Sequence, residues 1–267
     1  LDLLVEIVRE IDADGIFLDT LDQGAAGFRA KLDAARSGVV LESEGALPVE
    51  RINDHHLSWA QWFADSEAPG VLRNKWFERR HLQHQIKRWD RDHSGELHTA
   101  WMNGSGMMVW ENVFGLWVGW NARDRCILRT MLPIQRRFAN IFTGENWTPL
   151  VPTEQPGVYA SEWGGDNIRL WTLVNRSEKG VDGDLLKIAT TGEWFFDLIV
   201  GEEVTPKLMN GHVRLRGHIP PRGIGCYAAF RPSKSLDANW RAFLARQRAL
   251  NRRKDWNTRF PDRQTVL

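Results

Sequence analysis

Residues 12–20 read DADGIFLDT, a short apolar stretch that ends in a carboxylate. Asp14-Gly15 favours a turn, residues 16–18 are apolar, and Asp19 follows at once. So short and apolar a run is typical of a strand covered on both faces, as in parallel α/β sheets. An acid at the carboxyl end of such a strand lies where these sheets and barrels place active sites. The alternative is that Asp19, followed by Thr20, caps the next turn.

The sequence on both sides repeats this unit. Residues 1–13 carry apolar side chains at helical spacing, and 28–36 predict a second helix that stops at Ser37-Gly38. The apolar run 39–41 then ends in Glu42 and Glu44, and a third run, 107–110, ends in Glu111 and Asn112. Helix, strand and acid in alternation predict parallel βα repeats.

The segments between these runs are less regular. Residues 57–63 fit a strand or a short helix, and 70–72 open another possible strand. We expect helices over 77–89, over 96–102 with a stop at Asn103-Gly104, and over 124–142. Pro133 predicts a kink or break in the last of these helices.

The pattern changes after residue 152. Short alternating stretches follow, separated by Gly, Pro, Asn and Asp, at 168–174, 185–188, 194–200, 212–216 and 224–230. This spacing predicts a small antiparallel β-sandwich. We therefore expect an α/β plus all-β chain: the C-terminal part of a (β/α)8 TIM-type barrel over 1–148, a β-sandwich over 154–232, and a basic helix and linker over 233–267.

The start of the chain bears on how much of a barrel it holds. It opens without Met, inside the first predicted helix, and has only four or five βα units before residue 148. The first strands of a complete barrel would then lie before residue 1. We expect an internal piece of a longer protein, with further domains possible upstream and downstream.

Composition and charge narrow the possible partners and cofactors. The net charge of +1 gives no electrostatic reason to expect nucleic acid or an anionic membrane as a partner. No apolar run approaches the roughly 20 residues of a membrane span. The two cysteines, Cys126 and Cys226, support neither a disulfide framework nor a metal cluster.

One charged segment invites a metal interpretation. It contains two closely spaced histidines and, further on, two aspartates and a third histidine: His81, His84, Asp90, Asp92 and His93. Their spacing matches no established zinc or calcium pattern, so a solvated helix and loop is the preferred interpretation. We expect neither a metal nor an organic cofactor.

Tryptophan is unusually abundant. The chain has 14 Trp and 2 Tyr, and eight of the Trp fall within residues 59–120, at positions 59, 62, 76, 89, 101, 110, 117 and 120. Trp offers a flat apolar face and one N–H donor, which suit the C–H faces and hydroxyl edges of a sugar ring. Any single Trp is better explained as part of the core, but the cluster suggests that some, such as Trp59 and Trp110, line a cleft. His56, just before Trp59, is a candidate ligand for a sugar hydroxyl.

The acids and the tryptophans point to the same chemistry. In a parallel barrel the strands that end in Asp19, in Glu42 or Glu44, and in Glu111 open onto one face. Cleavage of a glycosidic bond needs two carboxylates across a pocket: one protonates the leaving oxygen, and the other attacks the anomeric carbon or activates water. Nearby aromatic side chains would hold the sugar and desolvate the acid.

The segment DGIFLDT resembles the fourth strand of retaining (β/α)8 glycoside hydrolases of the α-amylase and melibiase-like kind, where D-G-x-x-x-D ends in the nucleophile. The resemblance implies Asp19 as nucleophile, a carbohydrate substrate and a barrel followed by a β-sandwich. It also implies an acid/base Glu on the following strand, here Glu44 in VVLESEG, with Glu42 as the open alternative. MMVWENVFG resembles a late barrel strand whose Glu111 and Asn112 contact substrate. The Asp that melibiase-like families use after the sixth strand has no evident equivalent.

Two other functions remain open from the sequence. A non-catalytic carbohydrate-binding or scaffold module would keep the barrel without turnover, because a fold does not establish a function. The basic terminal helix would, in a third interpretation, tether a further domain that carries the main activity.

Overall fold

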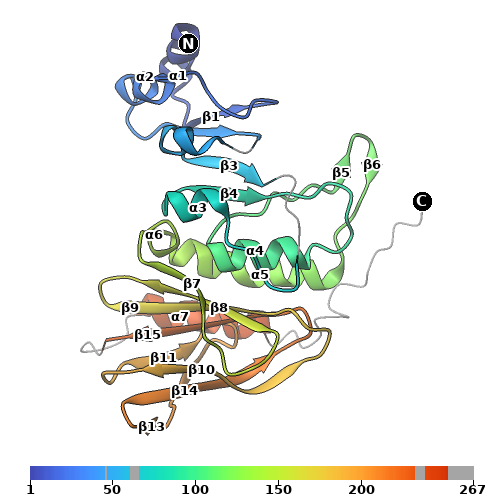
Figure 1. Ribbon diagram of the computed structural model, residues 1–267, viewed down its shortest axis with the longest axis vertical. Helices are drawn as coiled ribbons and strands as arrows, with labels where there is room; N and C mark the ends of the chain where they lie inside the picture. Colours follow the sequence, from blue (N-terminus) through green and yellow to red (C-terminus); the bar gives the residue numbers. More distant parts are fainter. Residues whose placement is uncertain (46, 61–65, 232–237, 252–267) are drawn as a thin grey trace.

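The computed structural model describes residues 1–45, 47–60, 66–231 and 238–251. Figure 1 shows a small parallel sheet at one end, helices α4 and α5 in the middle, and the antiparallel sheets at the other end. The strands within the described residues do not close into a barrel. The region predicted as part of a (β/α)8 barrel is therefore an open parallel sheet with helices on one face.

The parallel sheet follows the predicted alternation of helix and strand. Its strands pair in chain order: β1 (Gly15–Leu18), β2 (Val40–Ser43), β3 (Leu57–Ala60) and β4 (Leu82–Gln85). Helices α1 (Asp2–Ile11) and α2 (Phe28–Ala35) cover one face of β1 and β2. There Leu18 and Leu41 pack with Val8 and Leu32. Because side chains alternate along a strand, Phe17 and Glu42 lie on the other face.

The prediction of a helix over 77–89 is wrong. Helix α3 (Arg73–Phe77) ends where that helix was expected to begin, and β4 pairs with β3 in parallel. The strand is polar because neighbouring elements supply partners for its buried side: His81, just before it, shares a 2.8 Å hydrogen bond with Ser58 of β3. The stretch 70–72 is the loop before α3 instead of a strand.

The strand expected over 107–110 is also only partly present. Met107 forms an isolated parallel bridge with Gln85 of β4, and Val109 is 50% exposed. The chain leaves the sheet there and enters a hairpin of β5 (Asn112–Val113) and β6 (Leu116–Trp117). In Figure 1 this hairpin projects from the body of the molecule.

The two central helices agree closely with their predictions. Helix α4 (Ser94–Asn103) ends at Gly104, whose φ of 62° is the left-handed conformation that glycine adopts without strain. Helix α5 (Ala122–Arg137) contains Pro133 and is followed by α6 (Ala139–Phe142). The break falls at Phe138, a few residues after the proline.

The second half of the chain forms two packed antiparallel sheets. A six-stranded sheet has the order β12-β11-β15-β9-β8-β7, and a three-stranded sheet has the order β10-β14-β13. Their bounds are β7 (Trp147–Val151), β8 (Val158–Gly164), β9 (Ile168–Asn175), β10 (Val181–Ala189), β11 (Trp194–Asp197), β12 (Glu202–Val204), β13 (Leu208–Met209), β14 (His212–Ile219) and β15 (Ile224–Phe230). Strand β7 occupies residues that the sequence had left outside the sandwich.

The six-stranded sheet has an apolar core on each face. One core lies between the two sheets and includes Trp171, Leu215 and Tyr227. The other joins the opposite face of the six-stranded sheet to α4, α5 and α7 (Ala238–Asn251). The indole N–H of Trp101, in α4, donates to the carbonyl of Gly225 in β15 at 3.0 Å. The predicted basic terminal helix thus packs on the core through Trp240, Phe243 and Leu244. Residues 233–237 and 252–267, the rest of that segment, lie outside the described residues.

None of the helices in the described part of the chain has the length and apolar character that crossing a membrane requires.

Lys75 joins α3 to the central layer. Its side chain is fully buried, its Nζ donates to the carbonyl of Phe142 at 2.7 Å, and it lies within 5.8 Å of the ring centres of Trp147 and Trp163. Burial lowers the pKa of Lys75 to about 8 from its usual 10.5, and the charge of nearby Arg79 lowers it further. Folding therefore favours the neutral amine of this side chain.

This burial predicts a specific pH dependence of stability. Because the folded pKa is below the unfolded one, Lys75 raises the unfolding free energy as pH rises from about 8 to 10.5. Between pH 7 and pH 10 we expect the unfolding free energy of the wild type to rise by about 2 kcal/mol relative to that of Lys75→Met. The difference between the two proteins isolates Lys75 from Cys226, whose pKa is raised by burial and whose contribution to stability falls over the same range. Urea denaturation of both proteins at both pH values measures it. The exposed Lys31→Met is the control and should keep the gain; equal pH profiles for wild type and Lys75→Met would contradict the prediction.

Candidate functional site

The open face of the parallel sheet brings several predicted residues together. Phe17 is paired in register with Glu42, and Trp59 with His84. The Trp59 ring stacks on Phe17 with centroids 5.0 Å apart, and its indole N–H donates to Glu42 Oε1 at 3.0 Å. These contacts confirm that side chains from four neighbouring strands share one face. We call the side of the sheet that carries Phe17, Glu42, Trp59 and His84 the acid face.

Glu42 is held firmly by one of its two oxygens. Oε1 accepts from Trp59 and lies 2.8 Å from His84 Nδ1. Oε2 has no hydrogen-bond partner among the described residues, and the side chain is 17% exposed. The fold therefore satisfies one oxygen of this carboxyl group and leaves the other without a partner in the described part of the chain.

His84 is positioned by a close approach of the backbone. A Cβ built on Gly106 would lie 2.9 Å from His84 Cδ2 and 3.1 Å from its Nε2. The imidazole therefore occupies the space that a side chain at 106 would need. Since His84 Nδ1 faces the Glu42 carboxylate, Nδ1 is the nitrogen that carries the proton when the ring is neutral.

The Glu44 side chain, just after β2, bonds to groups that follow β1 and β4. Its Oε2 accepts from the backbone N–H of Thr20, just after β1, at 2.6 Å, and its Oε1 accepts from Arg88 at 3.0 Å. The Arg88 guanidinium in turn lies 4.4 Å from the ring centre of Trp110. A carboxylate paired with an arginine is better suited to accepting hydrogen bonds and fixing charge than to donating a proton.

Asp19 stands at the exit of β1. It is exposed and forms no hydrogen bond or ion pair within the described residues. Thr20, the next residue, has a φ of 58°, which is a strained conformation for a β-branched side chain. Strain of this kind gathers at active sites and ligand clamps. Glu44 helps to hold it in place by accepting the Thr20 N–H.

Aromatic side chains extend the acid face toward the hairpin. Trp110 lies edge-on to Trp59 at 6.4 Å and next to Phe114 at 6.1 Å, and Phe114 is 6.3 Å from Trp89. Phe114 is 75% exposed and has a φ of 50°, which its place in the tight β5–β6 turn imposes. A strained, exposed ring at a hairpin tip contributes to binding more readily than to a core.

The remaining tryptophans of the cluster have different places. Trp101 and Trp120 are fully buried in the core, Trp76 is exposed on α3, and Trp117 lies in the hairpin. Trp62 is outside the described residues. Of the cluster, Trp59, Trp89 and Trp110 therefore form the aromatic part of the acid face.

Glu111 and Asn112 support the hairpin backbone. Glu111 Oε1 accepts from the N–H of Trp120 at 3.3 Å, and Asn112 Oδ1 accepts from the N–H of Gly115 at 3.0 Å. The Asn112 carbonyl accepts from the indole of Trp110 at 2.7 Å. These bonds fix the position of Trp110 and of the hairpin tip.

His56 lies on the other face of the sheet. Its Nδ1 accepts from the backbone N–H of Leu41 at 3.2 Å, and it lines a cavity together with Arg29 of α2. Alternation along β3 separates it from Trp59. The structure thus does not bring His56 together with the acids.

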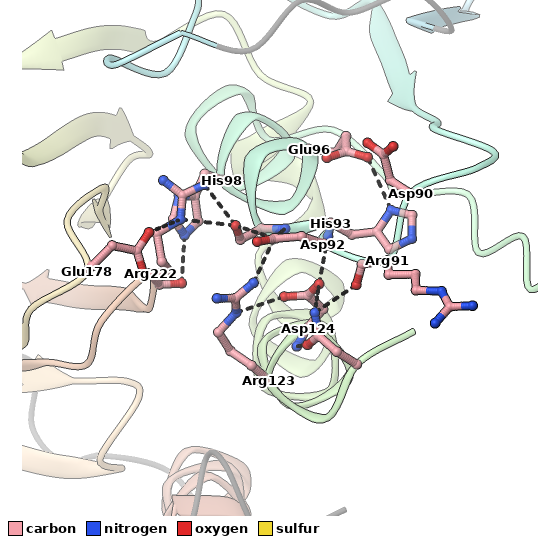
Figure 2. Close-up of polar contacts among 12 residues, drawn as sticks. Asp90, Arg91, Asp92, His93, Glu96, His98, Arg123, Asp124, Glu178 and Arg222 are labelled. Atoms are coloured by element: carbon pink, nitrogen blue, oxygen red, sulfur yellow. Dashed lines mark hydrogen bonds and ion pairs between the residues drawn. The ribbon is translucent and has the colours of Figure 1, made fainter. Parts of the chain in front are cut away.

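The charged segment around Asp90 is a loop that leads into α4 (Figure 2), in which His93 is buried while the Asp92 side chain is 61% exposed. The N–H of His93 donates to Asp124 at 2.6 Å, and His93 Nδ1 lies 3.1 Å from Glu96. Asp92 accepts from Ser94 and Arg123, while Arg222 of the sandwich donates to Ser94. Burial raises the pKa of Asp124. The search of the described residues finds no group of three or more His, Cys, Asp or Glu placed to hold a metal ion.

Sequence reasoning missed four members of the acid face: Phe17, His84, Arg88 and Phe114. Phe17 was recoverable, because it lies two residues before Asp19 and so shares its side of the strand. His84 and Arg88 fell in a segment that was predicted to be helical.

Solved structures share this architecture. The chain is similar to the α-amylase from Geobacillus thermoleovorans, solved with acarbose, at 12% identity and a TM-score of 0.59, covering 87% of this chain and 63% of that one. It is also similar to an Anoxybacillus α-amylase (12% identity, TM-score 0.56, 88% and 62% covered) and to AmyP solved with maltose (14%, 0.55, 88% and 68%).

This likeness concerns the fold. The chain has a glycosidase-like fold and spans about three fifths of the length of these two α-amylases. No protein-family model matches the sequence, and neither does any curated protein.

The contact between Gly106 and His84 generates a prediction. In Gly106→Ala the new Cβ displaces the imidazole, which is the mobile end of a side chain, so the unfolding free energy should change by about 1 kcal/mol or less. The bond from His84 Nδ1 to Glu42 should be lost. NMR of protein labelled with ¹⁵N-histidine reports it as a changed His84 Nδ1–H resonance. The neighbouring Ser105→Ala should leave that resonance in place; an unmoved resonance in Gly106→Ala would refute the contact.

Proposed function

We propose that the protein is a retaining glycoside hydrolase whose active site is the acid face. The observation that carries this proposal is the geometry of Glu42, which Trp59 and His84 hold by one oxygen while the other stays open. Asp19 directly follows the adjacent strand β1, and the exposed rings of Phe17, Trp89 and Phe114 offer flat apolar surfaces to a sugar. The glycosidase-like fold supports the same chemistry.

The roles follow from the contacts of each carboxyl group. Asp19, which has no partner among the described residues, attacks the anomeric carbon as Glu42 protonates the departing oxygen. A covalent glycosyl-enzyme intermediate forms on Asp19, and Glu42 then takes a proton from the water that hydrolyses it. Trp59 and His84 stabilise the negative charge that Glu42 acquires when it gives up its proton.

Glu44 has a positioning role in this proposal. It is already committed to Arg88 and to the N–H of Thr20, so it holds the residue next to the nucleophile and anchors Arg88 under Trp110. The sequence favoured Glu44 over Glu42 as the acid/base. The ion pair with Arg88 supports the opposite assignment, because a proton donor at that position would have to break it.

The structural relatives indicate which substrates to test first. Their complexes with acarbose and maltose make α-glucosides the first class to test, followed by other aryl glycosides and oligosaccharides. We expect the first-formed product to have the same anomeric configuration as the substrate, which ¹H NMR of the reaction measures.

Substitution of the acids tests the assignment. Asp19→Asn should abolish hydrolysis, and Glu42→Gln should lower kcat by about 10²–10⁴-fold, the usual contribution of general acid–base catalysis. Azide should restore cleavage of substrates with good leaving groups in both variants, giving the inverted glycosyl azide from Asp19→Asn and the retained one from Glu42→Gln. Melting temperatures should stay close to that of the wild type.

Two further variants serve as controls. Asp14→Asn changes an exposed carboxylate at the opposite end of β1 and should retain activity. Glu44→Gln should raise KM or lower kcat without azide rescue; a retained glycosyl azide from Glu44→Gln would move the acid/base role to Glu44. A wild type that binds sugars and hydrolyses none would replace the proposal with a carbohydrate-binding function.

A further inference from the structure

A cavity of about 600 Å³ lies over the outer face of the three-stranded sheet. In Figure 1 this sheet is at the opposite end of the molecule from the parallel sheet that carries the acid face. In β14, Val213 and Leu215 are buried in the core between the two antiparallel sheets. Because side chains alternate along a strand, the exposed Arg214 and Arg216 point away from that core and line the cavity. We call the cavity the basic groove, after its charged lining residues Asp184, Lys187, Lys207, Arg214 and Arg216.

The basic groove concentrates positive charge. Its lining has four lysine and arginine side chains and one carboxylate, whereas the whole chain has a net charge of +1. Lys187, Lys207 and Arg216 are exposed and form no hydrogen bond or ion pair within the described residues. These three cations therefore have no counter-charge in the part of the chain that the structure describes.

The register of β10 and β14 also brings like charges together. Lys187 is the cross-strand partner of Arg214, and Arg216 follows two residues later on the same face. Two cations directly opposite each other repel, because their Cβ atoms are only about 5 Å apart. The acids nearby, Asp184 and Glu154, lie 3.0 and 3.6 Å from the same Arg214 guanidinium. An acidic molecule bound over the basic groove would relieve the repulsion that remains.

The uncharged lining residues distinguish between acidic partners. Val204, Pro206 and Met209 give the basic groove an apolar part, and Met209 is 68% exposed. The described residues that line it include no aromatic side chain, so the groove offers no flat ring to a sugar or a nucleobase. Methionine and arginine are enriched together where proteins contact one another. These features favour a protein segment over an acidic polysaccharide or a nucleic acid.

We propose that the basic groove docks an acidic segment of another protein. Arg214 and Arg216 are about 7 Å apart along β14, which is also the distance between every second side chain of an extended segment. The segment would place two carboxylates, two residues apart, over these arginines and Lys187, with an apolar side chain next to Met209. Arginine binds a carboxylate through two nitrogens at once, which gives this contact direction as well as charge. The basic groove is separate from the acid face, and neither proposal depends on the other.

Fluorescence anisotropy of a labelled synthetic peptide tests the proposal. The peptide carries Leu, Glu, Glu and Leu at every second position, with Ser between them, so that all four face one way when it is extended. It should bind the protein in a saturable way, and added sodium chloride should weaken the binding. Replacement of both Glu by Gln should weaken it about tenfold or more, and replacement of both Leu by Ser should weaken it by a smaller factor.

Matched variants of the protein locate the peptide. Lys187→Gln combined with Arg216→Gln should weaken binding about tenfold, while the melting temperature stays the same or rises, because a repulsive pair is removed. Arg9→Gln removes an exposed charge from α1 and should leave the affinity unchanged. Met209→Ser should weaken binding, and Leu3→Ser, which changes a side chain of the same 68% exposure on α1, should not.

Several results would overturn the proposal. They are the absence of saturable binding, equal effects of the groove variants and their controls, and equal binding of the peptide with Ser in place of Leu. Polygalacturonate and single-stranded oligothymidine serve as competing acidic polymers. Tighter binding of either polymer than of the peptide, lost in the Lys187 and Arg216 double variant, would assign the basic groove to a polysaccharide or a nucleic acid instead.

Discussion

The parallel pairing of four short strands is the constraint on which the rest of this structure depends. In a parallel sheet every strand ends at the same edge, and every second side chain points to the same face. The register of the strands then sets which side chains are neighbours: Phe17 lies beside Glu42, and Trp59 lies beside His84. A shift of one residue in β2 would exchange Glu42 with Leu41 and place the carboxylate in the apolar layer under α2. The register of the strands therefore determines which side chains make up the acid face.

The central helices explain how so small a sheet is kept in place. Helix α4 is buried along its whole length, because one side supports β4 and the other packs on the six-stranded sheet. Its start is fixed by the bond from the His93 N–H to Asp124, and its end by the left-handed Gly104. The β-sandwich thus supports the parallel sheet through α4. This accounts for a core that crosses the boundary expected near residue 150.

The sequence predicted the fold best where side chains are apolar. β1 and β2, α2, α4 and five sandwich strands were placed closely, since each buries a continuous apolar face or run. β4 was mistaken for a helix because its sequence, LQHQ, is polar and its neighbours have helical spacing. Its burial depends on partners far along the chain, Ser58 and Gly106 among them, which no local pattern reveals. For the same reason the sequence found Glu42 and Glu44 but not their different partners, His84 for Glu42 and Arg88 for Glu44.

The two faces of the sheet show how one set of strands supports different polar environments. Parallel sheets are normally apolar on both sides, and polar residues there must find partners or ligands. On the acid face Trp59 and His84 both contact Oε1 of Glu42, and Oε2 has no hydrogen-bond partner among the described residues. On the other face the two ring nitrogens of His81 contact Ser58 Oγ and the His55 carbonyl, whereas His55 Nδ1 is buried with no hydrogen-bond partner among the described residues. The polar groups of this sheet therefore differ in how far the fold satisfies them, and the neighbouring strand or loop opposite each side chain determines that difference.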